Sequence, residues 1–219
     1  SVNGTTIGDD IKGSAKWSQD IITNKSNPIF NAGSIAVLKG SLAPNSAIIK
    51  QSAASENLLI HEGKAVVFEG LEDLANRIDT DDLDVTKDDV LVLKSIGPKG
   101  GPGMPEAGLI PIPKKLARQG VKDMVRISDG RMSGTASGTI VLHVTPESYE
   151  NGPLAIVQDG DLIKLDVPNR RIDLKISEKE IAKRIKKKEK MSIKRRGYNK
   201  IYMEHVTQAD KGVDFDFLI

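Results

Sequence analysis

From residue 33 onward the chain consists of short runs of aliphatic and β-branched residues, each bounded by glycine, proline, asparagine or aspartate. Short runs at this spacing are typical of strands in a closed or sandwiched sheet. The predicted strands cover residues 34–40, 47–50, 64–70, 89–95, 123–128, 139–144, 154–167 and 170–176. Asp159-Gly160 and Val167–Asn169 are the predicted turns of two or three consecutive antiparallel strands at the end of this series.

Few helices are predicted between these strands. The segments 72–78 and 110–120 have helical patterns, and the second carries Pro113 where a first turn tolerates proline and Gly120 where a helix would end. After Ser177 the sequence becomes helical and basic. We therefore expect a β-rich α/β domain rather than a doubly wound parallel sheet.

The first 30 residues are polar and rich in turn-forming residues, so they are predicted to be a linker with at most one short helix, which leaves residues 31–219 for the folded domain. A hydrophobic content of 38% is enough for a core. No apolar run approaches the roughly 20 residues that span a membrane, and the amino end lacks a signal-peptide pattern, so a cytoplasmic location is expected.

Charge and cysteine content exclude several classes of function. The 32 basic and 30 acidic residues nearly cancel, so no global field recruits nucleic acid or an anionic membrane. The absence of cysteine excludes disulfides, cysteine nucleophiles and an iron–sulfur cluster held by this chain. The chain begins with Ser1, which is compatible with processing, a chosen boundary or a fragment of a longer protein.

The stretch GPKGGPGMPE, residues 97–106, is the first candidate site. It does not fit a dinucleotide fingerprint, because Glu106 stands where the third glycine belongs, and it does not fit a P-loop, because Lys99 is followed by Gly100. A rigid backbone with few side chains favours a loop that approaches something closely and presents Glu106, a ligand suited to Mg²⁺. The alternative is an ordinary Gly/Pro turn with a solvated glutamate.

The stretch RISDGRMSGTASGT, residues 126–139, is the second candidate. It is not a nucleophile elbow, because Arg131 stands where that motif needs glycine. A serine hydrolase built on Ser133 would also need a histidine base, and His143 is expected to be a buried, hydrogen-bonded structural residue of its strand. An ordinary tight turn rich in serine and glycine is the other alternative.

Nine lysines and arginines lie between Lys183 and Arg196. A run of this kind could form a stand-alone binding module for an acidic partner. A solvated helix face is the alternative that we favour, because no aromatic residues interrupt the run to stack on nucleic-acid bases.

Taken together and in this order, GPKGGPGMPE and SDGRMSGT resemble the dihydroxy-acid and sugar-acid dehydratase family. The stretches GPLAIVQDGDLIKLDVPNRRIDL and HVTQADKGVDFDFL also look like family sequence, and the resemblance extends from about Asn27 to the end of the chain. It covers only the carboxy-terminal part of the family's polypeptide. The form of the SGT motif and the ending resemble the sugar-acid branch more than the branched-chain pathway enzyme.

The resemblance implies a swivelling β/β/α domain with a barrel-like core and flanking helices. It also implies a hydro-lyase that converts 2,3-dihydroxy acids to 2-keto acids, with Glu106 as a magnesium ligand, Ser133 as a base in its alkoxide form, and Thr135 as a hydrogen-bond partner of the serine or substrate. The iron–sulfur cluster and most magnesium ligands would belong to an amino-terminal domain absent from this chain. The expected partners are that domain, the small-molecule substrate and a second copy in a homo-oligomer. We expect the isolated domain to be inactive and to bind neither nucleic acid nor membrane.

Overall fold

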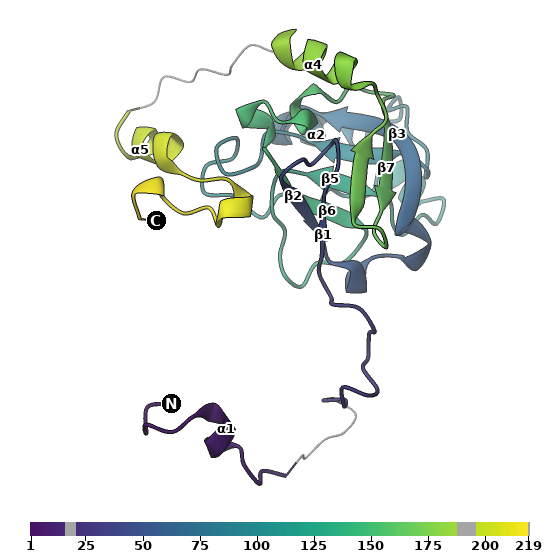
Figure 1. Ribbon diagram of the computed structural model, residues 1–219. Helices are drawn as coiled ribbons and strands as arrows, with labels where there is room; N and C mark the ends of the chain where they lie inside the picture. The colour runs from purple at the N-terminus through teal and green to yellow at the C-terminus, as the bar shows by residue number, and fades with distance from the viewer. Residues whose placement is uncertain (16–20, 188–195, 219) are drawn as a thin grey trace. The chain divides into compact units, whose positions relative to one another are not determined.

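The computed structural model describes residues 1–15, 21–187 and 196–218 of the chain (Figure 1). The chain divides into two compact units, Ser1–Gly33 and Ser34–Ile219. The first contains one short helix, α1 (Ile7–Asp10), which begins with a capping box: the Thr6 hydroxyl accepts the Asp9 N–H, and the Asp9 carboxylate accepts the Thr6 N–H. The candidate sites all belong to the second unit.

The second unit is organised around one mixed sheet of eight strands, in the order β1-β2-β6-β5-β4-β3-β7-β8 (Figure 1). The strands are β1 (Ala36–Leu38), β2 (Ser46–Ile49), β3 (Ile60–Phe68), β4 (Val90–Leu93), β5 (Arg126–Ser128), β6 (Ile140–Thr145), β7 (Leu162–Asp166) and β8 (Arg171–Leu174). A parallel bridge between Lys39, after β1, and Arg171 of β8 joins the two edges. The sheet is thus nearly closed into a barrel, which confirms the predicted β-rich α/β fold.

Strand direction divides the barrel into two parts. The neighbours β3, β4, β5 and β6 pair in parallel, whereas β1, β2, β7 and β8 pair antiparallel with their neighbours in the sheet. In a parallel sheet the carboxyl ends of all strands lie at one edge, where open α/β sheets bind their ligands. Both candidate motifs reach this edge, because the first follows β4 and the second contains β5 and the loop after it.

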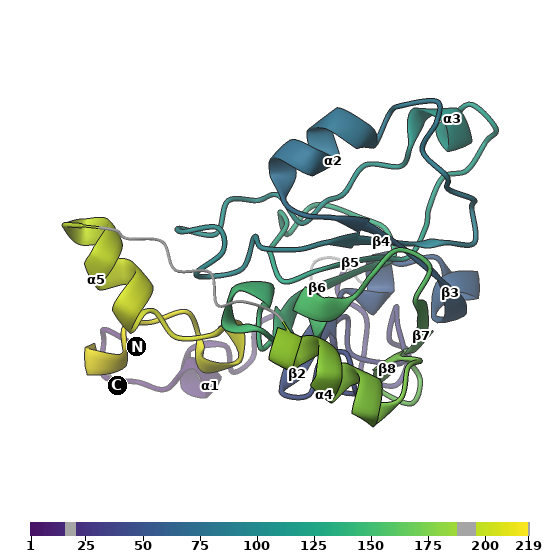
Figure 2. The ribbon, with the colours of Figure 1, turned by 90° about the horizontal axis from the view of Figure 1, so that it is seen from above.

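The strand residues alternate between two cores. Along β3, Ala65 and Val67 belong to a cluster that fills the barrel, while Val66 and Phe68 belong to a second cluster on its outer side. Helices α2 (Leu71–Arg77) and α3 (Lys114–Ala117) cover that outer face (Figure 2). Strand β4 is likewise buried on both faces, which is why its sequence is a continuous apolar run.

Two predicted elements differ from the observed ones. Residues 154–157 were expected to be part of a strand, and they form instead the buried 3₁₀ turn η4 (Pro153–Ile156), because Pro153 fixes the φ angle of a helical first residue. The β7–β8 hairpin that follows is as predicted. The helix expected over 110–120 is shorter than predicted and consists of α3 alone. Pro111 and Pro113 disfavour a helical conformation of the residues that precede them. The helix expected over 72–78 is α2, displaced by one residue.

The carboxy-terminal part of the described chain is helical. Helix α4 (Glu178–Lys187) packs Ile181 and Ile185 against the barrel core, and α5 (Tyr198–His205) follows. Among the described residues, no helix has the length and apolar character required to cross a bilayer.

Closure of the barrel depends on a glycine, and this dependence can be measured. A Cβ atom on Gly40 would overlap the backbone carbonyl of Ile172. We expect Gly40→Ala to lower the free energy of unfolding by about 1–3 kcal/mol, because backbone atoms must move to make room. Gly134→Ala is the matched control, since a Cβ at Gly134 would have no neighbour within 4 Å. Denaturant unfolding of both variants tests this, and equal stabilities would contradict it.

Candidate active site at the carboxyl ends of the parallel strands

Two loops at the carboxyl ends of β4 and β5 form the candidate site. The first runs from Lys94 through Glu106, and the second from Asp129 through Thr139. Gly108 N–H donates to the carbonyl of Arg131 at 2.7 Å, so the end of the first loop pairs with the second. The two motifs therefore lie side by side.

The Asp129 carboxylate holds these loops in place through hydrogen bonds. It is fully buried and accepts three backbone N–H groups, from Ser95 at 3.2 Å, Ile96 at 2.9 Å and Ser148 at 2.8 Å. Burial raises the pKa of the Asp129 carboxyl, and hydrogen bonds from Ser148 and Ile96 act in the opposite direction. One side chain thus joins the segments that follow β4, β5 and β6.

Glu147, after β6, anchors the glycine-rich loop in a similar way. Its buried carboxylate accepts the backbone N–H groups of Lys99 at 3.0 Å and Gly100 at 2.9 Å. The Gln208 amide donates to the same carboxylate at 2.6 Å, and its oxygen accepts the Glu147 N–H at 2.8 Å. Burial and, to a lesser extent, the charge of Asp129 raise the pKa of the Glu147 carboxyl. The carboxy-terminal segment therefore takes part in fixing the loop.

These anchors explain the glycines of the first motif. A Cβ atom on Gly97 would lie 2.7 Å from a Glu147 carboxylate oxygen, and one on Gly100 would lie 2.7 Å from the Ser95 carbonyl carbon. The close approach expected from the sequence is thus made within the domain itself. Gly103 differs, because a Cβ atom there would have no neighbour within 4 Å, but its φ of +85° favours glycine. Its N–H donates to the Tyr202 hydroxyl at 3.2 Å.

Glu106 lies at the exposed end of the first loop. Its carboxylate forms an ion pair with the Arg131 guanidinium at 3.0 Å, and Arg131 Nε donates to the Met104 carbonyl at 2.6 Å. Nearly half of the Glu106 side chain is exposed. The predicted metal ligand is therefore accessible, and it lies beside the loop that carries Ser133.

The Ser133 hydroxyl is half-buried and lies 3.1 Å from the Thr135 hydroxyl, with which it shares a hydrogen bond. Ser133 lines a hollow of about 220 Å³ together with Ile48 and Lys50 of the β2 segment and Leu142 and His143 of β6. The structure thus brings the two predicted catalytic residues together, and it adds side chains from two further strands.

His143 has an unusual backbone. Its φ is +52°, and an extra residue in β6 shifts the register against β2, so that the strand bulges at this point. The His143 N–H donates to the Gly130 carbonyl at 3.1 Å, but the buried Nδ1 atom has no hydrogen-bond partner among the described residues. Burial and the Arg131 charge lower the pKa of this imidazole. The expected side-chain hydrogen bond is therefore absent at Nδ1, and the structural role of His143 stays a prediction.

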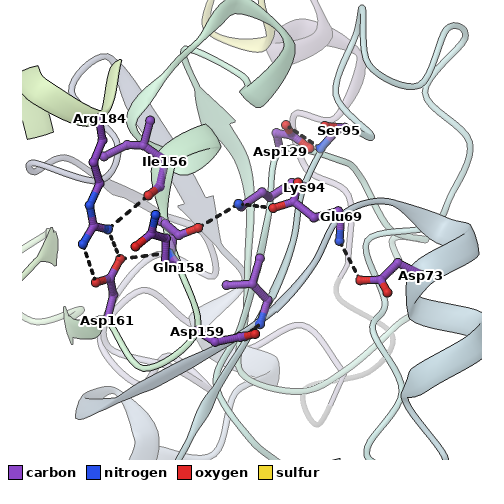
Figure 3. A network of polar contacts seen from close by, with 12 residues as sticks. Glu69, Asp73, Lys94, Ser95, Asp129, Ile156, Gln158, Asp159, Asp161 and Arg184 are labelled. Carbon is purple, nitrogen blue, oxygen red and sulfur yellow. Dashed lines mark hydrogen bonds and ion pairs between the residues drawn. The ribbon is translucent and has the colours of Figure 1, made fainter. Parts of the chain in front are cut away.

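A larger hollow lies elsewhere, beside the carboxyl ends of β3 and β4. It measures about 550 Å³ and holds the buried Lys94 amine, which donates to Glu69 at 2.5 Å and to the Val157 carbonyl at 2.7 Å (Figure 3). Arg184 at its edge is bound to Asp161 at 2.5 Å. These cations are neutralised within the domain, and none of the predicted catalytic residues lines this hollow, so we place the candidate site at Ser133.

The described residues offer few metal ligands. No group of three or more histidine, aspartate or glutamate side chains in the described part of the chain could hold a metal ion. Glu106 fits one position of a Mg²⁺ site, because it is an accessible hard oxygen ligand. The chain has no cysteine, so its residues do not fit an iron–sulfur cluster.

The basic run gives little support to a binding module. Residues 188–195 of this run lie outside the described part of the chain. Of the others, Lys183 pairs with Glu180 at 3.2 Å, and Arg184 pairs with Asp161 and Glu180. Lys183 and Arg184 therefore already have acidic partners on this domain, which leaves them less suited to bind an acidic partner protein.

Comparison with known proteins identifies the family of this chain. Residues 20–213 match the model of the dihydroxy-acid/6-phosphogluconate dehydratase C-terminal family, and the chain belongs to that family. It is 47% identical over its full length to L-arabinonate dehydratase of Rhizobium leguminosarum bv. trifolii. It is 45% identical to 6-deoxy-6-sulfo-D-gluconate dehydratase of Pseudomonas putida over 92% of the chain, and 40% identical to dihydroxy-acid dehydratase of Carboxydothermus hydrogenoformans over 98%.

These comparisons confirm the resemblance drawn from the two motifs. Identity is higher to the two sugar-acid dehydratases than to the dihydroxy-acid dehydratase, as the SGT motif and the ending of the chain predicted. The chain spans only 36–38% of the length of these three relatives.

The Gln208 contact provides a test of the loop anchor. We expect Gln208→Ala to lower the free energy of unfolding by about 1.5–3 kcal/mol, because a buried carboxylate loses a hydrogen-bond donor. Amide hydrogen exchange in residues 97–103 should become faster in this variant. Gln119→Ala is the control, since Gln119 is exposed on the turn after α3. Unchanged exchange in the loop would show that Gln208 does not hold it.

Proposed function

We propose that this chain supplies the base and one magnesium ligand for the dehydration of a 2,3-dihydroxy carboxylic acid to a 2-keto acid. The observation that carries the proposal is the junction of the two loops: Glu106 at the end of one is ion-paired with Arg131, two residues before Ser133 on the other. Similarity to several dehydratases supports the same class of reaction.

The chemistry defines what such a site must provide. A base removes the proton on C2, the electrons of that C–H bond form the C2–C3 double bond, and the C3–O bond breaks. The proton and the departing hydroxide together account for the released water. The resulting enol transfers its hydroxyl proton to C3 and becomes the 2-keto acid. The site therefore needs a base beside C2 and positive charge near the carboxylate end of the substrate.

Ser133 is the proposed base. Its hydroxyl is accessible from the 220 Å³ hollow, and the Thr135 hydroxyl at 3.1 Å can donate a hydrogen bond to it when it is ionised. A serine hydroxyl is too weak an acid to ionise in water, so the role requires positive charge close to its oxygen. Thr135 thus stabilises and orients the ionised form.

Glu106 is the proposed metal ligand. Its carboxylate lies at the exposed end of the loop, so it can complete a site whose other ligands come from outside the described residues. Mg²⁺, when bound there, would stabilise the negative charge that develops on the substrate carboxylate and C2 oxygen. Arg131, which pairs with Glu106, would orient that carboxylate.

The remaining parts of the enzyme are proposed to lie outside this chain. Since the chain covers 36–38% of its relatives, we infer that a further, amino-terminal domain supplies the other magnesium ligands and any iron–sulfur cluster. The isolated chain would then be inactive. Because identity is highest to sugar-acid dehydratases among the three relatives compared, we propose an aldonate-type substrate.

The test uses the full-length polypeptide that carries this chain. Ser133→Ala should lower kcat for 2-keto acid formation by about 10²–10⁴-fold, because the base is lost. Ser137→Ala is the matched control, since Ser137 is an exposed serine on the same loop. The assay offers L-arabinonate, D-gluconate and 2,3-dihydroxy-isovalerate in parallel. A Ser133→Ala enzyme with normal activity on its best substrate would exclude this proposal.

Glu106→Gln separates metal binding from the other functions of the loop. The amide keeps the size of the side chain but removes its charge, so the Mg²⁺ concentration for half-maximal activity should rise at least about tenfold. Isothermal titration with Mg²⁺ should show the same change. An unaltered Mg²⁺ dependence would mean that Glu106 is not a ligand.

Two alternative functions, a serine hydrolase and a binding module, predict different results for the same full-length polypeptide. A serine hydrolase would be labelled at Ser133 by a serine-directed phosphonate, and we expect no labelling. A binding module would lose its function on charge reversal across residues 183–196, whereas Ser133→Ala would leave dehydration intact. The dehydratase proposal predicts the opposite pair of results.

A further inference from the structure

The Ser133 turn is held by a lysine from a distant part of the sequence. Lys50 directly follows β2, and its Nζ atom donates to the Gly134 carbonyl at 2.6 Å. Gly134 adjoins Ser133 in the chain, and Lys50 and Ser133 line the same hollow. Ile48 and Lys50 line it together because alternate residues of an extended segment face the same side.

Among the described residues, the partner of the Lys50 ammonium group is the neutral Gly134 carbonyl rather than a carboxylate. The other charged or titratable groups near the serine differ in this respect. Arg131, on the same loop, is paired with Glu106, and His143 of β6 has a pKa lowered by burial and by the Arg131 charge. Lys50 therefore places a positive charge beside the Ser133 turn, and this charge can act on the serine.

We propose that Lys50 is a positioning residue for Ser133: its ammonium group holds the Ser133–Thr135 turn and favours the ionised serine. This inference rests on the proposed function of Ser133 as the base. An opposite charge a few ångströms from an acidic group lowers the pKa of that group by roughly one to three units. The carbonyl contact fixes the ammonium group at the turn, so its field acts on the serine without further rearrangement.

The proposal predicts a specific set of kinetic changes in the full-length enzyme. Lys50→Met should lower kcat by about 10²-fold with little change in KM, because the base becomes weaker while substrate contacts remain. Activity rises with pH as the base loses its proton, so the acidic limb of the kcat profile should move to higher pH by at least about one unit. A substrate deuterated at C2 should show a larger primary isotope effect on kcat.

Matched variants distinguish charge from bulk. Lys50→Arg keeps the charge and should retain at least about a tenth of the activity, whereas Lys122→Met, at an exposed lysine, should behave as wild type. Amide hydrogen exchange of residues 132–137 should be faster in Lys50→Met, and this readout does not depend on turnover.

Several outcomes would overturn the proposal. A raised KM with unchanged kcat would mean that Lys50 binds the substrate rather than supporting the base. An equal loss in Lys50→Met and Lys50→Arg without a shift of the pH profile would mean a purely structural contact. If Lys50→Met is fully active while Ser133→Ala is inactive, only this inference fails. If Ser133→Ala is active, the proposed function fails as well.

Discussion

Two buried carboxylates, Asp129 and Glu147, hold together the loops at the edge of the sheet where Ser133 lies. Each accepts hydrogen bonds from backbone N–H groups of the loops that follow the parallel strands. These N–H groups lie outside the regular hydrogen bonding of the sheet. A buried charge is costly unless it is fully hydrogen-bonded, so the loops and the carboxylates stabilise one another in a single arrangement. The position of Ser133 depends on this arrangement, because its loop begins at Asp129.

The sequence was sufficient for the fold class, most strands and the two motif loops, because apolar periodicity and turn residues are local signals. It did not reveal which residues close the barrel or the roles of Asp129 and Glu147, since these depend on contacts between residues far apart in the chain. The apolar composition of residues 154–157 resembles a buried strand, and only the preceding Pro153 indicates the 3₁₀ turn that the structure has there.

Within the site, the sequence led to Glu106, Ser133 and Thr135 through their motifs, and their catalytic roles remain predictions. Lys50 carries no motif, and only the antiparallel pairing of β2 with β6 brings it to the serine turn. The sequence gives no sign that His143 differs from an ordinary strand residue, because a bulge changes which face a side chain occupies without a recognisable sequence pattern.

The way in which the loops are anchored has a consequence for the evolution of specificity. Asp129 and Glu147 hold the loops mainly through backbone N–H groups, which every amino acid except proline supplies. Side chains on the exposed side of these loops can therefore be exchanged without loosening their anchors. A scaffold of this kind can accommodate new substrates through surface substitutions while the geometry around Ser133 is inherited unchanged.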